Sequence, residues 1–205
     1  MIKAKLGSEL DVWVRRALPF LFRRKVDPNL LTVIGTLISV GAAACFASGK
    51  PLAAGLLILA GGGFDLVDGV VARTFGIATR FGAFLDSTLD RVSDMVLLLG
   101  IAFWYASRGE PGLVLLAGYA LAVSVLVSYA QARAELVIQG FRVGLFERAE
   151  RILVLALGAL SGFLVPALWI VAIGSTVTVI QRFARAHREM ALMDAGGAAG
   201  AEGRG

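Results

Sequence analysis

The chain has 205 residues, of which 58% are hydrophobic and only 17% are charged, and its mean hydropathy is +0.79. A soluble domain carries about a quarter charged residues, so this composition favours a membrane protein. The net charge of +5 could suit a nucleic-acid-binding protein, but the basic residues stand at the ends of apolar runs and form no basic stripe, which excludes that class. The single cysteine, Cys45, excludes an internal disulfide and a cysteine-based zinc site.

The two ends of the chain differ from its middle in composition. Residues 8–24 predict an amphipathic helix at the membrane surface, because apolar residues fall near one face and arginines on the other would meet lipid phosphates. We therefore interpret residues 1–28 as a cytoplasmic juxtamembrane segment. Residues 190–205 end in a Gly- and Ala-rich stretch that can bury little surface, which predicts a disordered tail.

Six apolar runs lie between these ends. They cover residues 29–48, 51–73, 82–106, 111–133, 147–164 and 166–184. Runs of about 18–25 residues are long enough as helices to cross the hydrocarbon core of a bilayer. The sequence thus predicts an all-α integral membrane protein, with six transmembrane helices over residues 29–189 and an N-terminal amphipathic interfacial helix.

The basic residues predict the orientation of this bundle. Lysines and arginines gather in residues 1–28, in the loops after the second and fourth runs and in the C-terminal tail, whereas the other side carries only Lys50 and Arg108. Basic loops remain on the cytoplasmic side of a membrane. We expect a multi-pass protein of the cell membrane with both termini in the cytoplasm.

Five aspartates lie inside or beside the second and third runs: Asp65, Asp68, Asp86, Asp90 and Asp94. The first two are three residues apart and the other three are four apart, so each set shares a helix face. Such a group of like charges requires protonation or a cation between the carboxylates. Oxygen ligands select a hard divalent cation such as Mg²⁺ or Mn²⁺, and a site for one or two such ions would suit phosphate transfer.

Small and basic residues accompany the aspartates. Gly69 and Ala72 share a helix face and Gly82 opens the third run, so a phosphate or nucleotide could approach the backbone closely. Arg73 could bind a phosphate in bidentate fashion. A structural alternative is that the aspartates form ion pairs that hold the bundle together, for instance Asp90 with Arg91. Acids inside a membrane are costly and usually functional, which favours a reaction centre.

The pattern Asp65-x-x-Asp68-Gly69-x-x-Ala72-Arg73, followed by Gly82-x-x-x-Asp86-x-x-x-Asp90, resembles the complete signature of the CDP-alcohol phosphotransferases. This resemblance implies transfer of a phosphatidyl group from CDP-diacylglycerol to an alcohol, with release of CMP. It implies that Asp65, Asp68, Asp86 and Asp90 bind metal, with two ions expected, and that Asp90 is also the general base. It places Asp68, Gly69, Ala72 and Arg73 at the CDP site, and the preceding motif Pro28-Asn29-Leu30-Leu31-Thr32 adds Asn29 and Thr32. The same motif is also an ordinary helix start.

The acceptor should be recognised by the remaining cytoplasmic residues. Arg133, Arg148, Arg151 and Arg182 stand at run ends facing one side, which suits an acceptor that already carries a phosphate, although arginines there also serve as positive-inside anchors. The surrounding stretches resemble the phosphatidylinositol-phosphate synthases of that family, which implies inositol phosphate as acceptor. Those enzymes commonly carry lysine where this chain has Gln131, so glycerol 3-phosphate, free inositol and other polyols stay open.

Two other classes of protein fit parts of the pattern. An ion-coupled transporter would also place acids inside apolar runs, but near the middle of the bilayer, whereas these acids lie at run ends. A protein that only assembles with partners through small residues, such as those at Gly35 and Ser39, would need no aspartates. The family resemblance implies a homodimer, and membrane lipid is the expected surrounding.

Overall fold

The computed structural model describes residues 27–75 and 79–202, with only the backbone for several residues of α3 and for the end of α7. The described residues are all-α and contain no strand, as predicted. They form the helices α2 (Pro28–Ala47), α3 (Pro51–Phe75), α4 (Arg80–Ser107), α5 (Pro111–Glu135), α6 (Arg148–Ser161) and α7 (Leu164–Glu202). The predicted amphipathic helix over residues 8–24 lies outside the described residues.

The helix starts follow from local sequence. Asp27 caps α2 by accepting a hydrogen bond from the backbone N of Asn29 at 2.9 Å, and Pro28 occupies the first turn, where its missing N–H costs nothing. Thr79 caps α4 in the same way through the backbone N of Gly82, at 2.9 Å. The caps fix where α2 and α4 begin, and both helices start beside residues of the predicted nucleotide site.

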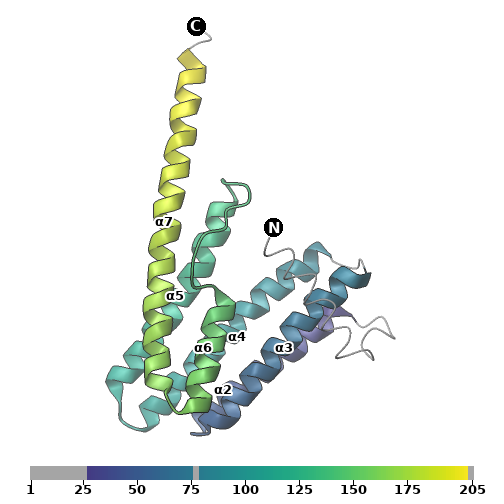
Figure 1. Cartoon of the computed structure of the whole chain (residues 1–205), viewed down its shortest axis with the longest axis vertical. Helices are drawn as coiled ribbons and strands as arrows, with labels where there is room; N and C mark the ends of the chain where they lie inside the picture. Colours follow the sequence, from purple (N-terminus) through teal and green to yellow (C-terminus); the bar gives the residue numbers. More distant parts are fainter. Residues whose placement is uncertain (1–26, 76–78, 203–205) are drawn as a thin grey trace.

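The six helices lie side by side (Figure 1), and their packing contacts form a closed ring. Helix α2 packs against both α3 and α4, α5 packs against α4 and α7, and α6 packs against α3 and α7. The two helices that carry the aspartate signature, α3 and α4, therefore flank α2. Helices α4 and α6 have different main packing partners, and polar contacts between them reach across the ring.

All six helices contribute to the core of the bundle, and several of its largest side chains come from α2, α4 and α7. Phe46, Leu97, Ile101, Leu168 and Val171 are all buried. Close packing of helix backbones complements them, because a Cβ added to Gly100 would lie 2.5 Å from the carbonyl oxygen of Ala43. Only glycine lets α4 approach α2 this closely.

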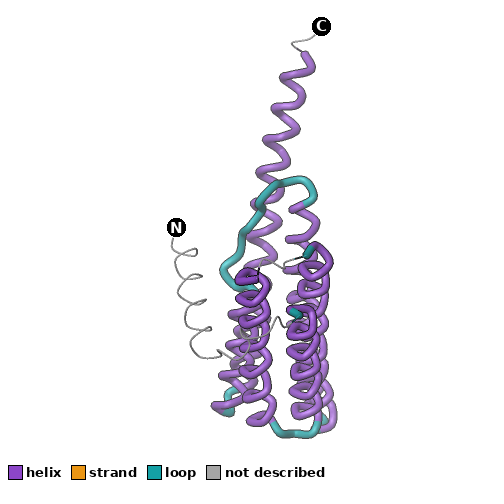
Figure 2. Tube along the Cα trace, turned by 90° about the vertical axis from the view of Figure 1, so that its right-hand side faces the viewer, coloured by secondary structure: helices purple, strands orange, loops and turns teal. Residues whose placement is uncertain are grey.

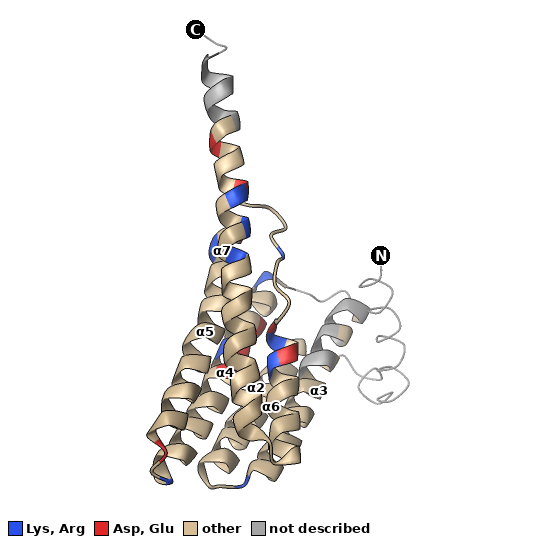
Figure 3. Ribbon diagram, turned by 60° about the vertical axis from the view of Figure 1, so that its left-hand side comes forward, with Lys and Arg blue, Asp and Glu red and all other residues tan. Residues whose placement is uncertain are grey.

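The apolar character of the helices matches a membrane protein. Helices α2 and α5 and the segment Leu164–Ala195 of α7 are long and apolar enough to cross a bilayer. Many large apolar side chains point outward, such as Phe103 and Leu115, which are 64% and 75% exposed. Figure 3 shows the charged residues gathered at the end of the bundle from which α7 projects, with a few at the opposite end.

Two features differ from the sequence expectation. Helix α6 has only 14 residues and begins at Arg148, so it rises about 21 Å rather than spanning a full predicted run. Helix α7 continues to Glu202, into the segment for which we expected disorder, since alanine has the highest helix propensity. This extension projects beyond the bundle (Figures 1 and 2), and residues 191–195 are exposed.

The connection between α5 and α6, residues 136–147, runs back toward the bundle before α6 begins (Figure 2). It is docked on α7 by side chains that accept from its backbone. The N–H of Phe146 donates to Thr178 Oγ1 at 3.1 Å, and the N–H of Leu145 donates to Gln181 Oε1 at 3.3 Å. A short α6 and this returning segment leave room for a polar cavity inside the ring.

Candidate active site

A cavity of about 430 Å³ lies between α4, α5, α6 and α7, where α5 ends and α6 begins. Its wall is formed by Asp90, Arg91, Val127, Ser128, Gln131, Glu135, Arg142, Glu147, Arg148, Arg151 and Arg182. Five arginines stand against three carboxylates in this set, so the wall has a formal charge of +2. A positively charged cavity of this size suits a small anionic ligand.

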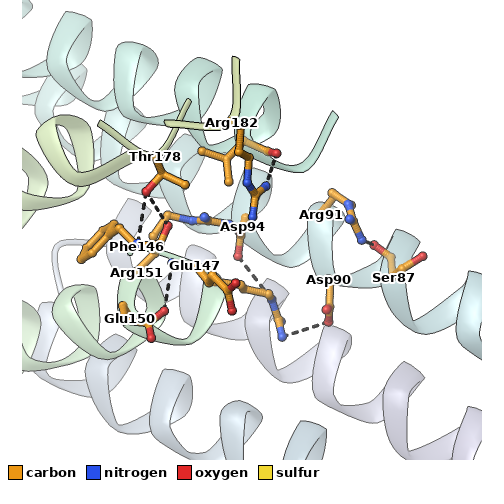
Figure 4. A network of polar contacts seen from close by, with 12 residues as sticks. Ser87, Asp90, Arg91, Asp94, Phe146, Glu147, Glu150, Arg151, Thr178 and Arg182 are labelled. Carbon is orange, nitrogen blue, oxygen red and sulfur yellow. Dashed lines mark hydrogen bonds and ion pairs between the residues drawn. The ribbon is translucent and has the colours of Figure 1, made fainter. Parts of the chain in front are cut away.

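Ion pairs across the ring connect α4 to α6 (Figure 4). Arg148 Nη1 lies 2.9 Å from Asp90 Oδ1, and Arg148 Nε lies 3.5 Å from Asp94 Oδ1. Arg151 Nη2 donates to Asp94 Oδ2 at 2.7 Å. These contacts join Asp90, the last aspartate of the signature, to Arg148, and join Asp94, one turn further along α4, to both Arg148 and Arg151.

Arg151 is the most deeply buried cation of this wall. Its side chain is only 3% exposed, and its Nε and Nη1 atoms are buried without a hydrogen-bond partner. A buried guanidinium normally uses most of its donors, because an unsatisfied polar group in a low-dielectric environment is costly. Two unused donors on the wall of a cavity therefore point to an anionic ligand.

Arg182 uses its donors differently. Its side chain is 5% exposed, its Nε donates to the carbonyl of Val143 at 2.7 Å, and its Nη1 donates to the carbonyl of Val127. Arg182 thus joins α7 to α5 and to the connection before α6. It lines the cavity but two of its nitrogens hold the wall together.

Gln131 lines the cavity at the position for which the family resemblance implies a lysine. Its Nε2 donates to Glu135 Oε1 at 2.6 Å and to the carbonyl of Phe141, and its Oε1 is buried without a partner. The side chain adds no cation. The positive charge of the cavity therefore comes from the arginines alone.

The aspartate signature is divided between two helices. Asp86 and Asp90 lie one turn apart on α4, and both are partly exposed. Asp65, Asp68, Gly69, Ala72 and Arg73 lie on α3, where the structure describes the backbone alone. Among the side chains that are described, no group of three or more His, Cys, Asp or Glu could hold a metal ion. Asp65 and Asp68 of α3 lie outside that set.

The start of α2 lies beside the start of α4. A Cβ added to Gly82 would stand 3.0 Å from Asn29 Oδ1 and 3.0 Å from Thr79 Oγ1. Thr32 is 5% exposed and its hydroxyl donates to the carbonyl of Pro28 at 3.1 Å. Asn29, which is predicted for the nucleotide site, therefore lies beside Gly82, where the sequence predicts close approach of a phosphate or nucleotide to the backbone.

The structure brings together three of the four predicted acceptor residues, Arg148, Arg151 and Arg182. The fourth, Arg133, is exposed on α5 and is not part of the cavity wall. Arg142, on the connection before α6, is part of it. Arg91 donates to the carbonyl of Ser87, so the suggested pair with Asp90 does not form, and Asp90 contacts Arg148 instead. Charge alone could not separate these arginines, since all precede or follow apolar runs.

Comparison with known proteins places this geometry among related enzymes. The chain matches the CDP-alcohol phosphatidyltransferase family model over residues 25–190. A phosphatidylinositol phosphate synthase of Streptomyces avermitilis is 41% identical over 216 residues, which cover 96% of this chain and 88% of that protein. An archaetidylinositol phosphate synthase of Pyrococcus horikoshii is 37% identical, over 82% of this chain and 87% of that protein.

The fold is also similar to solved structures. Two structures of a phosphatidylinositol phosphate synthase of Mycobacterium tuberculosis are each 33% identical to this chain. The first has CDP-DAG bound, a TM-score of 0.75, and covers 84% of this chain and 92% of that one. The second is a complex with manganese and citrate, with a TM-score of 0.76 and coverage of 84% and 88%.

Proposed function

The chain belongs to the CDP-alcohol phosphatidyltransferase family, and from that premise we propose that it transfers a phosphatidyl group from CDP-diacylglycerol to inositol phosphate and releases CMP. Relatives named for inositol phosphate products cover nearly the whole chain, and a similar structure holds CDP-DAG. Family membership favours this transferase over the ion-coupled transporter that the intramembrane acids alone could have suggested.

The observation that supports a phosphorylated acceptor most directly is Arg151. Its guanidinium is almost completely buried, lines the cavity and has two nitrogens without a partner. Arginine binds phosphate through paired N–H donors more strongly than a neutral group can. An unphosphorylated polyol would offer these two nitrogens no anionic acceptor beyond the carboxylate of Asp94. Arg148 and Arg182 line the same cavity and add positive charge, and Arg133, by contrast, is placed outside it.

The metal ions of the family fit the donor set of this chain. Asp86 and Asp90 are one turn apart and partly exposed, and Asp65 and Asp68 lie on α3 with the same one-face spacing. Carboxylate oxygens without nitrogen or sulfur ligands select Mg²⁺ or Mn²⁺. We propose two ions held by these four residues; when bound, they would neutralise the pyrophosphate and stabilise the departing CMP.

The side chains around the cavity would have separate roles in the reaction. Asp90 takes the proton from the attacking hydroxyl of the acceptor, which a carboxylate beside the cavity can reach. Arg151 and Arg148 hold the acceptor phosphate and so orient that hydroxyl toward Asp90. The start of α2, with Asn29 and Thr32, and the segment of α3 with Asp68, Gly69, Ala72 and Arg73 bind CDP.

We also propose that the six helices cross the cell membrane with both termini and the cavity on the cytoplasmic side. Basic residues concentrate at the end of the bundle where the cavity lies, and the opposite end carries few. Helix α6 is too short to cross the full bilayer alone. The 136–147 connection and the polar cavity take up the remaining distance on the cytoplasmic side. The apolar outer surface suits membrane lipid and a second copy in a homodimer.

The experiment that tests the function is CMP release by the purified full-length enzyme with CDP-diacylglycerol and Mg²⁺. Inositol phosphate, free inositol, glycerol 3-phosphate and serine are supplied one at a time. We expect release with inositol phosphate. Release only with glycerol 3-phosphate would keep the phosphate site and change the acceptor, and release only with free inositol or serine would contradict a phosphorylated acceptor.

A further inference from the structure

Asp94 is a buried carboxylate that the aspartate signature does not include. It lies one turn beyond Asp90 on α4, is only 7% exposed, and forms ion pairs with Arg151 and Arg148. A carboxylate buried among helices carries a large desolvation cost, which a paired arginine offsets only when the geometry is good. Such a residue is a weak stabiliser of a fold, so its position beside the cavity suggests another role.

The ion pairs of Asp94 reach across the ring of helices. Helix α4 packs mainly against α2 and α5, whereas α6 packs mainly against α3 and α7. The side chain of Arg151 has several rotatable bonds. Each must be fixed before its planar guanidinium can bind a phosphate. Asp94 is a fixed partner opposite the first turn of α6: it contacts both Arg148 and Arg151, and Figure 4 shows Arg151 beside it.

We infer that Asp94 is a positioning residue that orients Arg151 for the phosphate of the acceptor; this inference rests on the proposed function. Asp94 Oδ2 accepts one hydrogen bond from Nη2 at 2.7 Å and leaves Nε and Nη1 for the ligand. It also supplies negative charge next to two arginines, so that they can stand close together before any anion binds.

A buried arginine with a purely structural role would use its nitrogens to bind neighbouring segments of the protein. Arg182 provides the comparison inside the same cavity, because two of its nitrogens donate to the backbone carbonyls of Val127 and Val143 and so fasten neighbouring segments. Arg151 donates to a single side chain and keeps two buried nitrogens without a partner. Because of this difference, we assign Arg182 mainly to holding the cavity wall together, and the Asp94–Arg151 pair to binding the ligand.

The test compares Asp94→Asn and Asp94→Glu with the wild type in the purified full-length enzyme. The KM for the phosphorylated acceptor, the KM for CDP-diacylglycerol and kcat are measured separately. We expect Asp94→Asn to raise the acceptor KM by about 10-fold or more, because a charge-assisted contact that aligns Arg151 is lost, and to change the CDP-diacylglycerol KM by less than about two-fold. Asp94→Glu keeps the charge and should recover part of the acceptor affinity.

A readout independent of turnover is calorimetric binding of inositol phosphate to the detergent-solubilised enzyme. Asp94→Asn should weaken it in the wild-type background and have little further effect in an Arg151→Gln background, because the two residues act as one unit. The matched control is Glu110→Gln, which removes an exposed ion pair with Arg108 at the opposite end of the bundle; it should leave both KM values unchanged.

The outcomes separate this inference from the proposed function. If the wild type releases no CMP with a phosphorylated acceptor, the proposed function fails before any variant is compared. If the wild type is active and Asp94→Asn lowers the melting temperature and kcat while the acceptor KM and inositol phosphate binding stay as in the wild type, Asp94 has a structural role only. Equal effects of Asp94→Asn with and without Arg151 would likewise overturn the inference.

Discussion

Asp90 Oδ1 lies 2.9 Å from Arg148 Nη1, so the last aspartate of the signature on α4 is bonded to the first residue of α6. The two side chains are 23% and 26% exposed, which leaves both accessible from the cavity. The proposed base and a proposed phosphate-binding cation are therefore adjacent. An acceptor that binds its phosphate at the arginines has its hydroxyl delivered next to the group that takes the proton.

Asp90→Asn should abolish turnover while leaving CDP-diacylglycerol binding largely intact. Asparagine retains the shape of the side chain but cannot accept the proton of the acceptor hydroxyl, and loss of a general base alone costs about 10²–10⁴-fold in rate. CMP release and nucleotide binding are measured on the same preparation. A near-normal rate for Asp90→Asn would show that another group is the base.

Arg151→Gln should raise the KM for the phosphorylated acceptor by about 10- to 100-fold, as expected for the loss of hydrogen bonds to a charged group. Arg133→Gln is the matched control, because Arg133 is exposed on α5 and does not line the cavity. The control should keep the acceptor KM within about two-fold of the wild type. Equal losses in the two variants would mean that overall charge, rather than the cavity, attracts the acceptor.

The helical architecture could be predicted because its signals are local. Apolar runs, turn residues and capping residues such as Asp27 and Thr79 fix where the helices begin, and α2, α3, α4 and α5 each begin and end within two residues of a predicted run. The length of α6 could not be predicted in this way. The run over 147–164 includes charged residues that belong to the cavity, and only the packing of the bundle shows that Arg148 and Arg151 form the first turn of a short helix.

In the candidate site, too, some features could be predicted from the sequence and others could not. The aspartates and the general position of the arginines follow from spacing and composition. The contacts that distinguish Arg151 from Arg133, or that give Asp94 two arginine partners, depend on which helices face each other across the ring. Asp94 and Arg151 are 57 residues apart in the sequence, so the helical periodicity of residue types could not predict that they pair.

Gly82→Ala should raise the KM for CDP-diacylglycerol and leave the acceptor KM nearly unchanged. The added Cβ would lie 3.0 Å from Asn29 Oδ1, closer than ordinary contact, and would shift the Asn29 side chain. Gly112→Ala is the control, because a Cβ there meets nothing within 4 Å. An unchanged CDP-diacylglycerol KM in Gly82→Ala would argue against Asn29 and Gly82 as parts of the nucleotide site.

Removal of divalent cations with EDTA should stop CMP release, and added Mg²⁺ or Mn²⁺ should restore it. Carboxylate ligands bind these hard cations, and four clustered aspartates without them repel one another. The dependence of the rate on metal concentration is compared for the wild type and Asp86→Asn, and the variant should require more metal. Full activity in EDTA would exclude a metal-dependent reaction for this chain.

Gly100→Ala should destabilise the bundle, whereas Gly118→Ala should not. The Cβ of alanine at position 100 would lie 2.5 Å from the carbonyl oxygen of Ala43, so α4 must move away from α2, and overpacking of this kind costs about 1–3 kcal/mol. Gly118 is exposed in the interior of α5 and its added Cβ meets nothing within 4 Å, so alanine there should stabilise the helix by about 0.5–1 kcal/mol. Thermal unfolding in detergent measures both. Equal melting temperatures for the two variants would contradict the close α2–α4 contact on which the placement of the α4 aspartates depends.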